Sequence, residues 1–266
     1  VYKRQHRMKE IELYRLNADE KIVHVPETHS IVVRFSVPKK VLSTSLLNGG
    51  YREDIKGLFN YTCCGPGSCM SLEKYEEHLG KCAAVVGLDP AHSTGIGTAA
   101  LMENAAIVEE TYEELKVAAC VTAGVEGNAG CAGDPAGYYG AGARPEMYKL
   151  GTINILLFIN ADMPPGILTR ALVTCTEGKT AALRELMVGS RYSENPATGT
   201  GTDSTIIVCD PKSPLYFRSA GKHNKLGELI GKTVKEAVKK ALGNQNHLYP
   251  STQHSVTGCL LYTSPS

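Results

Sequence analysis

Residues 11–37 read IELYRLNADEKIVHVPETHSIVVRFSV, and this stretch indicates a β meander at the start of the fold. Apolar residues occupy every second position from Ile31 to Val37, which is the pattern of a strand with one buried face. Polar turns interrupt the apolar pattern twice. We therefore expect three successive strands, at residues 11–16, 21–25 and 29–37.

The rest of the chain alternates between strand and helix patterns. Two more strands are expected on either side of an Asn-Gly-Gly turn, at residues 41–47 and 55–60. Later strands are predicted at residues 105–111, 115–122, 152–160 and 204–209. Apolar stripes at helical spacing predict helices from Ser71 to about Gly80, over residues 164–189 and over residues 225–242.

Strands that cluster early and alternate with helices later are typical of an α+β fold. We predict a single domain over residues 6–245, with a mixed, largely antiparallel sheet packed against helices. An α/β fold with a wholly parallel sheet is the second possibility. Residues 1–5 and 260–266 fit the neighbouring pattern poorly and are interpreted as non-native extremities.

The charge of the chain excludes one class of partner. It has 28 basic and 27 acidic residues, a formal net charge of +1, and no basic stripe that could neutralise phosphates, so nucleic acid is not an expected partner. The most apolar run, residues 153–159, is too short to cross a bilayer, and no charged and apolar leader opens the chain. We expect a cytoplasmic protein that does not bind membranes. The sequence leaves the oligomeric state open.

Nine cysteines are spread along the chain without a signal peptide, so most are predicted to be reduced thiols packed as small apolar side chains. The densest group lies near His78 and lacks the paired Cys-x-x-Cys spacing of structural zinc sites. No metal site is therefore predicted. Whether a metal binds this group is left open for Cys63, Cys64, Cys69 and Cys82.

Two segments near predicted strand ends contain candidate substrate-binding residues. Residues 122–134, TAGVEGNAGCAGD, combine glycines that permit close backbone approach with the polar side chains of Thr122, Asn128 and Asp134. A plain surface turn capped by Asp134 is the alternative. In the second segment Asn154 interrupts an apolar strand, and an unpaired buried amide costs about 1–3 kcal/mol. Its partner is expected to be either a backbone bridge or an oxyanion or substrate.

Residues 176–182, TEGKTAA, fall in the middle of a predicted helix. Glu177 can point toward the sheet edge if Gly178 bends the helix. Otherwise the glutamate forms a solvated pair with the neighbouring lysine.

Residues 197–203, ATGTGTD, lack the spacing of a phosphate-binding loop. Their hydroxyls and backbone N–H groups suit an oxyanion, and Asp203 suits the orientation of a water or hydroxyl. Downstream, His223 is the only histidine beside a glycine-rich segment of this kind. Histidine can transfer a proton near neutral pH.

Taken together and in order, these motifs resemble the adenosylcobinamide amidohydrolase family of corrinoid salvage enzymes. The match covers roughly residues 46–242. It rests on TAG…AGD at 122–134, GTIN at 151–154, TEGKTAAL at 176–183, ATGTGTD at 197–203 and GKHNKLGEL at 221–229.

The resemblance implies hydrolysis of the amide that joins aminopropanol to a side chain of the corrin ring, giving adenosylcobyric acid for reuse in cobalamin assembly. The corrinoid is then the substrate, and no cofactor is predicted. We expect a water activated by Glu177 or Asp203, with His223 protonating the amine. In an alternative assignment Thr200 or Thr122 is a covalent nucleophile.

The remaining predicted site residues hold the oxyanion or contact the substrate. Thr198 and Thr200 are expected to hold the oxyanion together with backbone N–H groups. The residues expected to contact the corrinoid are Thr122, Asn128, Asp134, Asn154, Thr198, Thr202 and Asn224.

Two other functions compete with hydrolysis. A non-catalytic corrinoid-binding protein would bind the same ligand without releasing a product. A nucleotide-binding transferase could use the threonine- and glycine-rich loop, but the absence of a Walker pattern disfavours it.

Overall fold

The computed structural model describes residues 8–63, 72–137, 139 and 151–250. A nine-stranded sheet has the path β1-β2-β3-β11-β9-β7-β6, and β4 joins it by pairing with β3 and β5. Its strands are β1 (Ile11–Arg15), β2 (Lys21–Val25), β3 (Ser30–Ser43), β4 (Gly50–Thr62), β5 (Ser93–Thr98), β6 (Ala106–Tyr112), β7 (Leu115–Ala123), β9 (Ile153–Ile159) and β11 (Ser204–Cys209). A separate ribbon pairs β8 (Ala129–Gly130) with β10 (Gly199–Thr200).

The strand directions confirm the predicted α+β class. The pairs β4–β5 and β9–β11 are parallel. The other named pairs are antiparallel, so the sheet is mixed and largely antiparallel. The helices are α1 (Leu72–Val85), α2 (Pro165–Glu185) and α3 (Lys225–Asn246), with short 3-10 turns at Pro26–Thr28, Pro90–His92 and Met102–Asn104.

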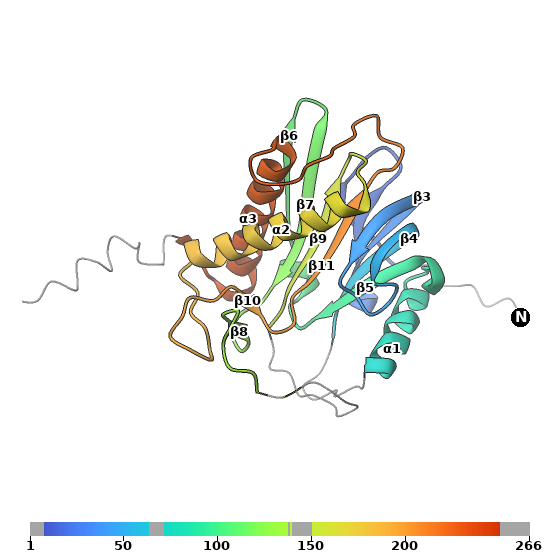
Figure 1. Ribbon diagram of the computed structural model, residues 1–266. Helices are drawn as coiled ribbons and strands as arrows, with labels where there is room; N and C mark the ends of the chain where they lie inside the picture. The colour runs from blue at the N-terminus through green and yellow to red at the C-terminus, as the bar shows by residue number, and fades with distance from the viewer. Residues whose placement is uncertain (1–7, 64–71, 138, 140–150, 251–266) are drawn as a thin grey trace, which may run out of the picture.

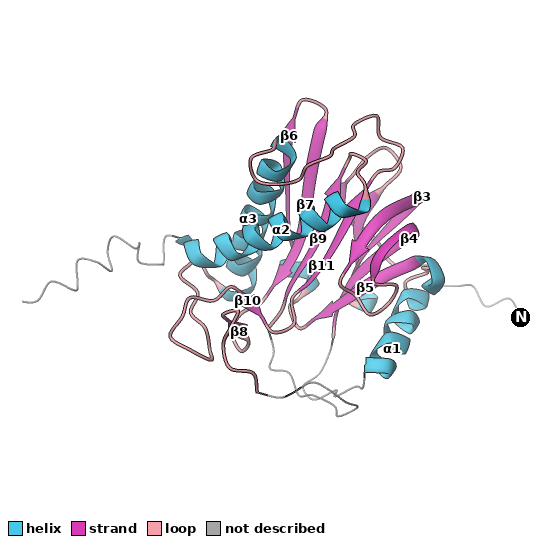
Figure 2. Cartoon of the chain, in the orientation of Figure 1, coloured by secondary structure: helices cyan, strands magenta, loops and turns pink. Residues whose placement is uncertain are grey.

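Three apolar clusters divide the molecule into layers of helix, sheet, sheet and helix (Figures 1 and 2). Helices α2 and α3 cover one face of β6, β7, β9 and β11. The opposite face of β7, β9 and β11 packs on β2, β3, β4 and β5, because the sheet folds back on itself. Helix α1 covers the outer face of that second half.

This layering buries β7 and β9 on both faces. Val117, Ala119 and Val121 of β7 pack toward α2 and α3, whereas the alternating Ala118 and Cys120 pack between the two halves of the sheet. A strand buried on both faces reads as a nearly continuous apolar run. A polar residue within such a strand is therefore conspicuous.

The structure corrects three details of the predicted elements. The predicted strands at residues 29–37 and 41–47 are one long strand, β3, with an irregularity in its pairing to β4. Helix α1 continues past Gly80, and Gly87, with φ of 73°, follows its end. The glycine-rich residues 94–100 include most of β5, which was not predicted because glycine disfavours strands.

The two predicted extremities, residues 1–5 and 260–266, lie outside the described residues, as do Cys64 and Cys69. Within the described ranges, no helix has the length and hydropathy needed to cross a membrane.

Candidate active site

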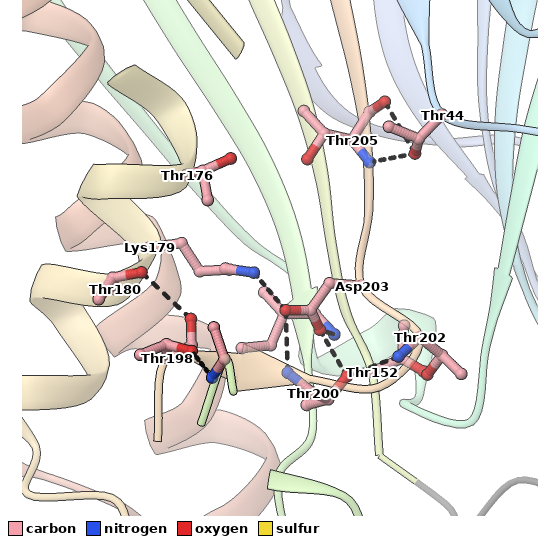
Figure 3. A network of polar contacts seen from close by, with 12 residues as sticks. Thr44, Thr152, Thr176, Lys179, Thr180, Thr198, Thr200, Thr202, Asp203 and Thr205 are labelled. Carbon is pink, nitrogen blue, oxygen red and sulfur yellow. Dashed lines mark hydrogen bonds and ion pairs between the residues drawn. The ribbon is translucent and has the colours of Figure 1, made fainter. Parts of the chain in front are cut away.

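The candidate site lies at the edge of the sheet where β7 ends and where β9 and β11 begin. In the strand register, Thr122 of β7 and Ser204 of β11 both lie beside Asn154 of β9. Residues 196–203 run along this edge and enter β11 (Figure 3). The pairing of β8 with β10 brings the other glycine-rich segment, residues 122–134, to the same place.

Asp203 is the centre of the polar contacts in this loop (Figure 3). Its Oδ1 accepts hydrogen bonds from the Thr200 hydroxyl at 2.5 Å and from the backbone N–H of Ile153 at 2.9 Å. Its Oδ2 accepts one from the backbone N–H of Thr200 at 3.0 Å and forms an ion pair with the Lys179 ammonium. The side chains of Lys179 and Asp203 are only 12% and 13% exposed. Several donors therefore hold a mostly buried carboxylate in one geometry.

Lys179 reaches Asp203 from the buried face of α2. The solvated pair with Glu177, which the sequence left as an alternative, is not formed. Cys175 and Leu183, four residues before and after Lys179, are buried on that helix. Residues four apart share a helix face. A lysine on an otherwise apolar stripe was thus the signal in the sequence that could have placed Lys179 in the site.

The surroundings of Gly199 show why a glycine lies between two threonines of the loop. A Cβ atom at this position would collide with the Lys179 ammonium and the Asp203 carboxylate. Gly199 therefore leaves the space that the ion pair occupies.

The contacts of Asp203 limit its chemistry. A carboxylate offers about four acceptor positions. Two N–H groups, one hydroxyl and one ammonium occupy them here. An attacking water could bind Asp203 only by displacing one of these donors, whereas the Thr200 hydroxyl is already in contact with it.

Two other threonines fasten the loop to its neighbours. The Thr198 hydroxyl accepts a hydrogen bond from the backbone N–H of Ala132 at 2.8 Å, so its own proton stays available to donate. The Thr202 hydroxyl lies 2.5 Å from that of Thr152 and donates to the carbonyl of Gly151 at 3.0 Å. The structure thus brings Thr198, Thr200 and Thr202 together around Asp203.

Asn154 bridges the two halves of the sheet. Its Nδ2 donates to Asn60 Oδ1 at 2.9 Å and to the carbonyl of Gly97 at 3.0 Å. Asn60 in turn donates to the Thr122 hydroxyl at 2.8 Å. The Oδ1 of Asn154 is buried and has no hydrogen-bond partner among the described residues. The amide therefore makes a backbone bridge, which is one of the two partners that the sequence left open.

Asn128 and Asp134 hold the first glycine-rich segment against the next loop. Asn128 donates to the carbonyl of Gly151 at 3.1 Å and accepts from the Tyr192 hydroxyl at 2.9 Å. Asp134 accepts hydrogen bonds from the hydroxyls of Ser190 and Ser193 and from a backbone N–H, and these lower the pKa of its carboxyl. Both side chains thus have partners within the protein.

The structure does not bring three predicted residues to Asp203. Glu177 is exposed and pairs with Lys222 at 3.3 Å, and α2 is unbroken at Gly178. His223 is exposed, and Asn224 caps α3 by accepting a hydrogen bond from the backbone N–H of Leu226.

The start of α3 lies at the opposite end of the sheet from Asp203. The Lys225 ammonium lies 4.6 Å from the ring centre of Tyr112, next to the turn between β6 and β7. The seven residue steps along β7 from Leu115 to Thr122 span about 24 Å at roughly 3.4 Å per residue. His223 and Asn224 are therefore far from the loop that contains Asp203.

The described cysteines divide into two groups. Cys120, Cys175 and Cys209 are buried, and burial raises the pKa of each thiol to about 12. Cys63, Cys82 and Cys131 are partly exposed, and the sulfur of Cys82 lies 3.5 Å from Nε2 of His78 on the same helix. In the part of the chain that the structure describes, no three metal-ligating side chains form a cluster. The absence of a metal at the cysteine-rich segment stays a prediction, since Cys64 and Cys69 are outside that part.

The chain is similar to a known protein family and to proteins from two organisms. The model of the family described as adenosylcobinamide amidohydrolase matches residues 13–250. An uncharacterized protein of Methanocaldococcus jannaschii is 32% identical over 235 residues, covering 84% of this chain and 89% of the relative. The adenosylcobinamide amidohydrolase of Methanosarcina mazei is 30% identical over 175 residues, covering 63% and 74%.

Two solved structures superpose on most of the chain. A β-aminopeptidase of Burkholderia sp. does so with a TM-score of 0.42 at 13% identity, covering 90% of this chain and 84% of the other. The L-aminopeptidase D-Ala-esterase/amidase of Ochrobactrum anthropi has a TM-score of 0.41 at 12% identity, covering 90% and 83%.

Proposed function

The chain belongs to the adenosylcobinamide amidohydrolase family, and we propose that it hydrolyses the aminopropanol amide of adenosylcobinamide. Membership makes it a hydrolase that acts on an amide bond. The products of the proposed reaction are adenosylcobyric acid and aminopropanol, and the reaction would return an incomplete corrinoid to cobalamin assembly in the cytoplasm. The name of the relative from Methanosarcina mazei supports this substrate.

One observation carries the proposal: the Thr200 hydroxyl donates to a carboxylate that Lys179 and two backbone N–H groups hold in place. A hydroxyl becomes a nucleophile when a base in hydrogen-bond contact accepts its proton. Of the nucleophiles left open by the sequence, the contacts favour Thr200 over a water activated by Asp203. They also favour it over Thr122, whose buried hydroxyl accepts a hydrogen bond from Asn60.

In the proposed reaction, Thr200 Oγ forms a bond to the amide carbon while its proton moves to Asp203. The tetrahedral intermediate then collapses, the C–N bond breaks, and this proton leaves on the nitrogen of aminopropanol. Water hydrolyses the resulting threonine ester, which releases adenosylcobyric acid and restores the Thr200 hydroxyl. The available proton of Thr198 is suited to the oxyanion of both steps.

This route replaces the predicted proton donor and gives Lys179 a role that the sequence did not predict. Asp203, next to Lys179, returns the proton to the amine in place of His223. Lys179 keeps the carboxylate oriented toward Thr200 as the proton moves. Asn154, with its unused Oδ1, remains a proposed contact for an N–H group of the corrinoid.

The decisive experiment incubates the purified protein with adenosylcobinamide, without added metal or nucleotide, and detects both products by mass spectrometry. We expect both products from the wild type and from Thr200→Ser, and a loss of about 10²-fold or more in kcat for Thr200→Val. Intact-protein mass spectrometry should detect an adduct equal to the substrate minus aminopropanol.

The outcomes separate the competing functions. If the Thr200→Val variant stays active and no adduct is detected, water and not Thr200 attacks the amide. Corrinoid binding without product, in protein shown to be folded, would favour the non-catalytic corrinoid-binding protein.

A further inference from the structure

Asn60 lies in the layer between the two halves of the sheet and contacts Thr122 and Asn154. It is a residue of β4 and is only 1% exposed. Its Oδ1 accepts a hydrogen bond from Asn154, and its Nδ2 donates to Thr122. Because Asn154 also donates to Gly97 of β5, one connected network joins β4, β5, β7 and β9.

This network ends one residue away from a contact of Asp203. Ile153 directly precedes Asn154, and its backbone N–H donates to Asp203 Oδ1 at 2.9 Å. Thr152, the residue before it, touches Thr202 through its hydroxyl. The start of β9 is thus held by the other half of the sheet on one side and holds residues 200–203 on the other.

The direction of the hydrogen bonds gives Asn60 its importance. A side-chain amide has one acceptor and two donor hydrogens, and each end of Asn60 has a different partner. Both ends are satisfied only in one orientation of the amide. A buried and satisfied polar network of this kind fixes the relative position of the elements it joins.

We propose that Asn60 is a positioning residue for the reaction: through Asn154 it fixes the start of β9 so that the N–H of Ile153 meets Asp203. This rests on the proposed role of Asp203 and Thr200. Catalytic groups must be held within about 0.5 Å of their productive geometry. Loss of the network therefore acts on turnover more than on substrate binding.

The test compares Asn60→Leu, which removes both hydrogen bonds, with Asn60→Asp, which keeps an acceptor for Asn154 and can accept from the Thr122 hydroxyl. We expect Asn60→Leu to lower kcat about tenfold or more, as small misplacements of reacting groups do, while KM changes less than about twofold. Asn60→Asp should restore most of kcat. Thr122→Val gives a second, milder break of the same network.

A matched control is present in the same layer. The hydroxyls of Ser43 and Thr94 form a buried hydrogen bond of 2.9 Å between β3 and β5, with no connection to Asp203 among the contacts of the described residues. Thr94→Val and Thr122→Val each remove one buried hydroxyl at nearly constant shape. Only Thr122→Val should lower kcat.

Hydrogen exchange at the amide of Ile153 gives a readout that needs no substrate. Faster exchange there in Asn60→Leu, but not in Thr94→Val, is the expected result. Unchanged exchange together with unchanged kcat in Asn60→Leu would overturn the positioning role, as would equal effects in both threonine variants. If the wild type releases no product from adenosylcobinamide, the proposed function fails, and exchange at Ile153 still decides the role of Asn60.

Discussion

Asp203 and Glu177 are the two carboxylates that the sequence offers as a base, and the structure gives them opposite surroundings. Asp203 is only 13% exposed and accepts from four donors around the start of β11. Glu177 is about half exposed, and its ion pair is with Lys222. Exposed ion pairs of this kind contribute little, about 0–1 kcal/mol.

A sequence motif therefore does not specify which of its residues faces the site. Glu177 and Lys179 belong to the same seven-residue motif and are two positions apart on α2. Positions two apart point to different sides of a helix. The sheet lies on the side of Lys179, so the lysine is part of the site and the glutamate is not in contact with it.

The two carboxylates should differ most in their effect on turnover. We expect Asp203→Asn and Lys179→Met to lower kcat by about 10²–10³-fold, the range seen when one preorganised electrostatic group is removed. Glu177→Gln and His223→Ala should stay within about threefold of the wild type, because surface substitutions usually have small effects. Steady-state kinetics with adenosylcobinamide measures all four.

The reverse ranking would restore the first assignment of roles. A large decrease in kcat for Glu177→Gln or His223→Ala, in protein with wild-type thermal stability, would mean that these side chains reach the substrate by a movement absent from this structure.

Much of the fold was predictable because its patterns are local. The strands at residues 21–25 and 204–209 were predicted with the boundaries that the structure has. The long apolar stripe of α3 was equally clear. Strand β5 was missed, because Gly95 and Gly97 give no strand signal by themselves and are required by the side chains packed against them.

The candidate site was predictable only in part, for a physical reason. The sequence identified Asp203 and the threonines around it, since such residues before a strand suggest chemistry. It could not identify Asn60, because the partners of that residue are 62 and 94 positions away along the chain. Neither could it separate His223 from the site, because only the path of β7 shows that α3 begins at the other end of the sheet.

Thiol labelling tests which side of α2 faces inward. Burial raises the pKa of Cys175, one turn before Lys179, to about 12, so at pH 8 its thiol stays protonated. A cysteine introduced by Glu177→Cys on the exposed side should have an ordinary pKa near 8.5, and should react with iodoacetamide roughly 10³-fold faster. Peptide mapping by mass spectrometry separates the two positions, and labelling in denaturant should make them equal.

The smallest expected effect concerns Gly178, which the sequence suggested as a point where α2 bends. In the structure α2 is continuous, and Gly178 lies where α2 crosses α3: a Cβ there would be 3.2 Å from the carbonyl oxygen of Gly231. Alanine at Gly178 gains about 1 kcal/mol of helix propensity but crowds the backbone of α3, which costs about 1–3 kcal/mol. We expect Gly178→Ala to lower the free energy of unfolding. Gly231→Ala, whose Cβ would meet open space, should be neutral or stabilising. Denaturant unfolding measures both, and a stabilised Gly178→Ala would show that the close approach of the two helices is not the reason for this glycine.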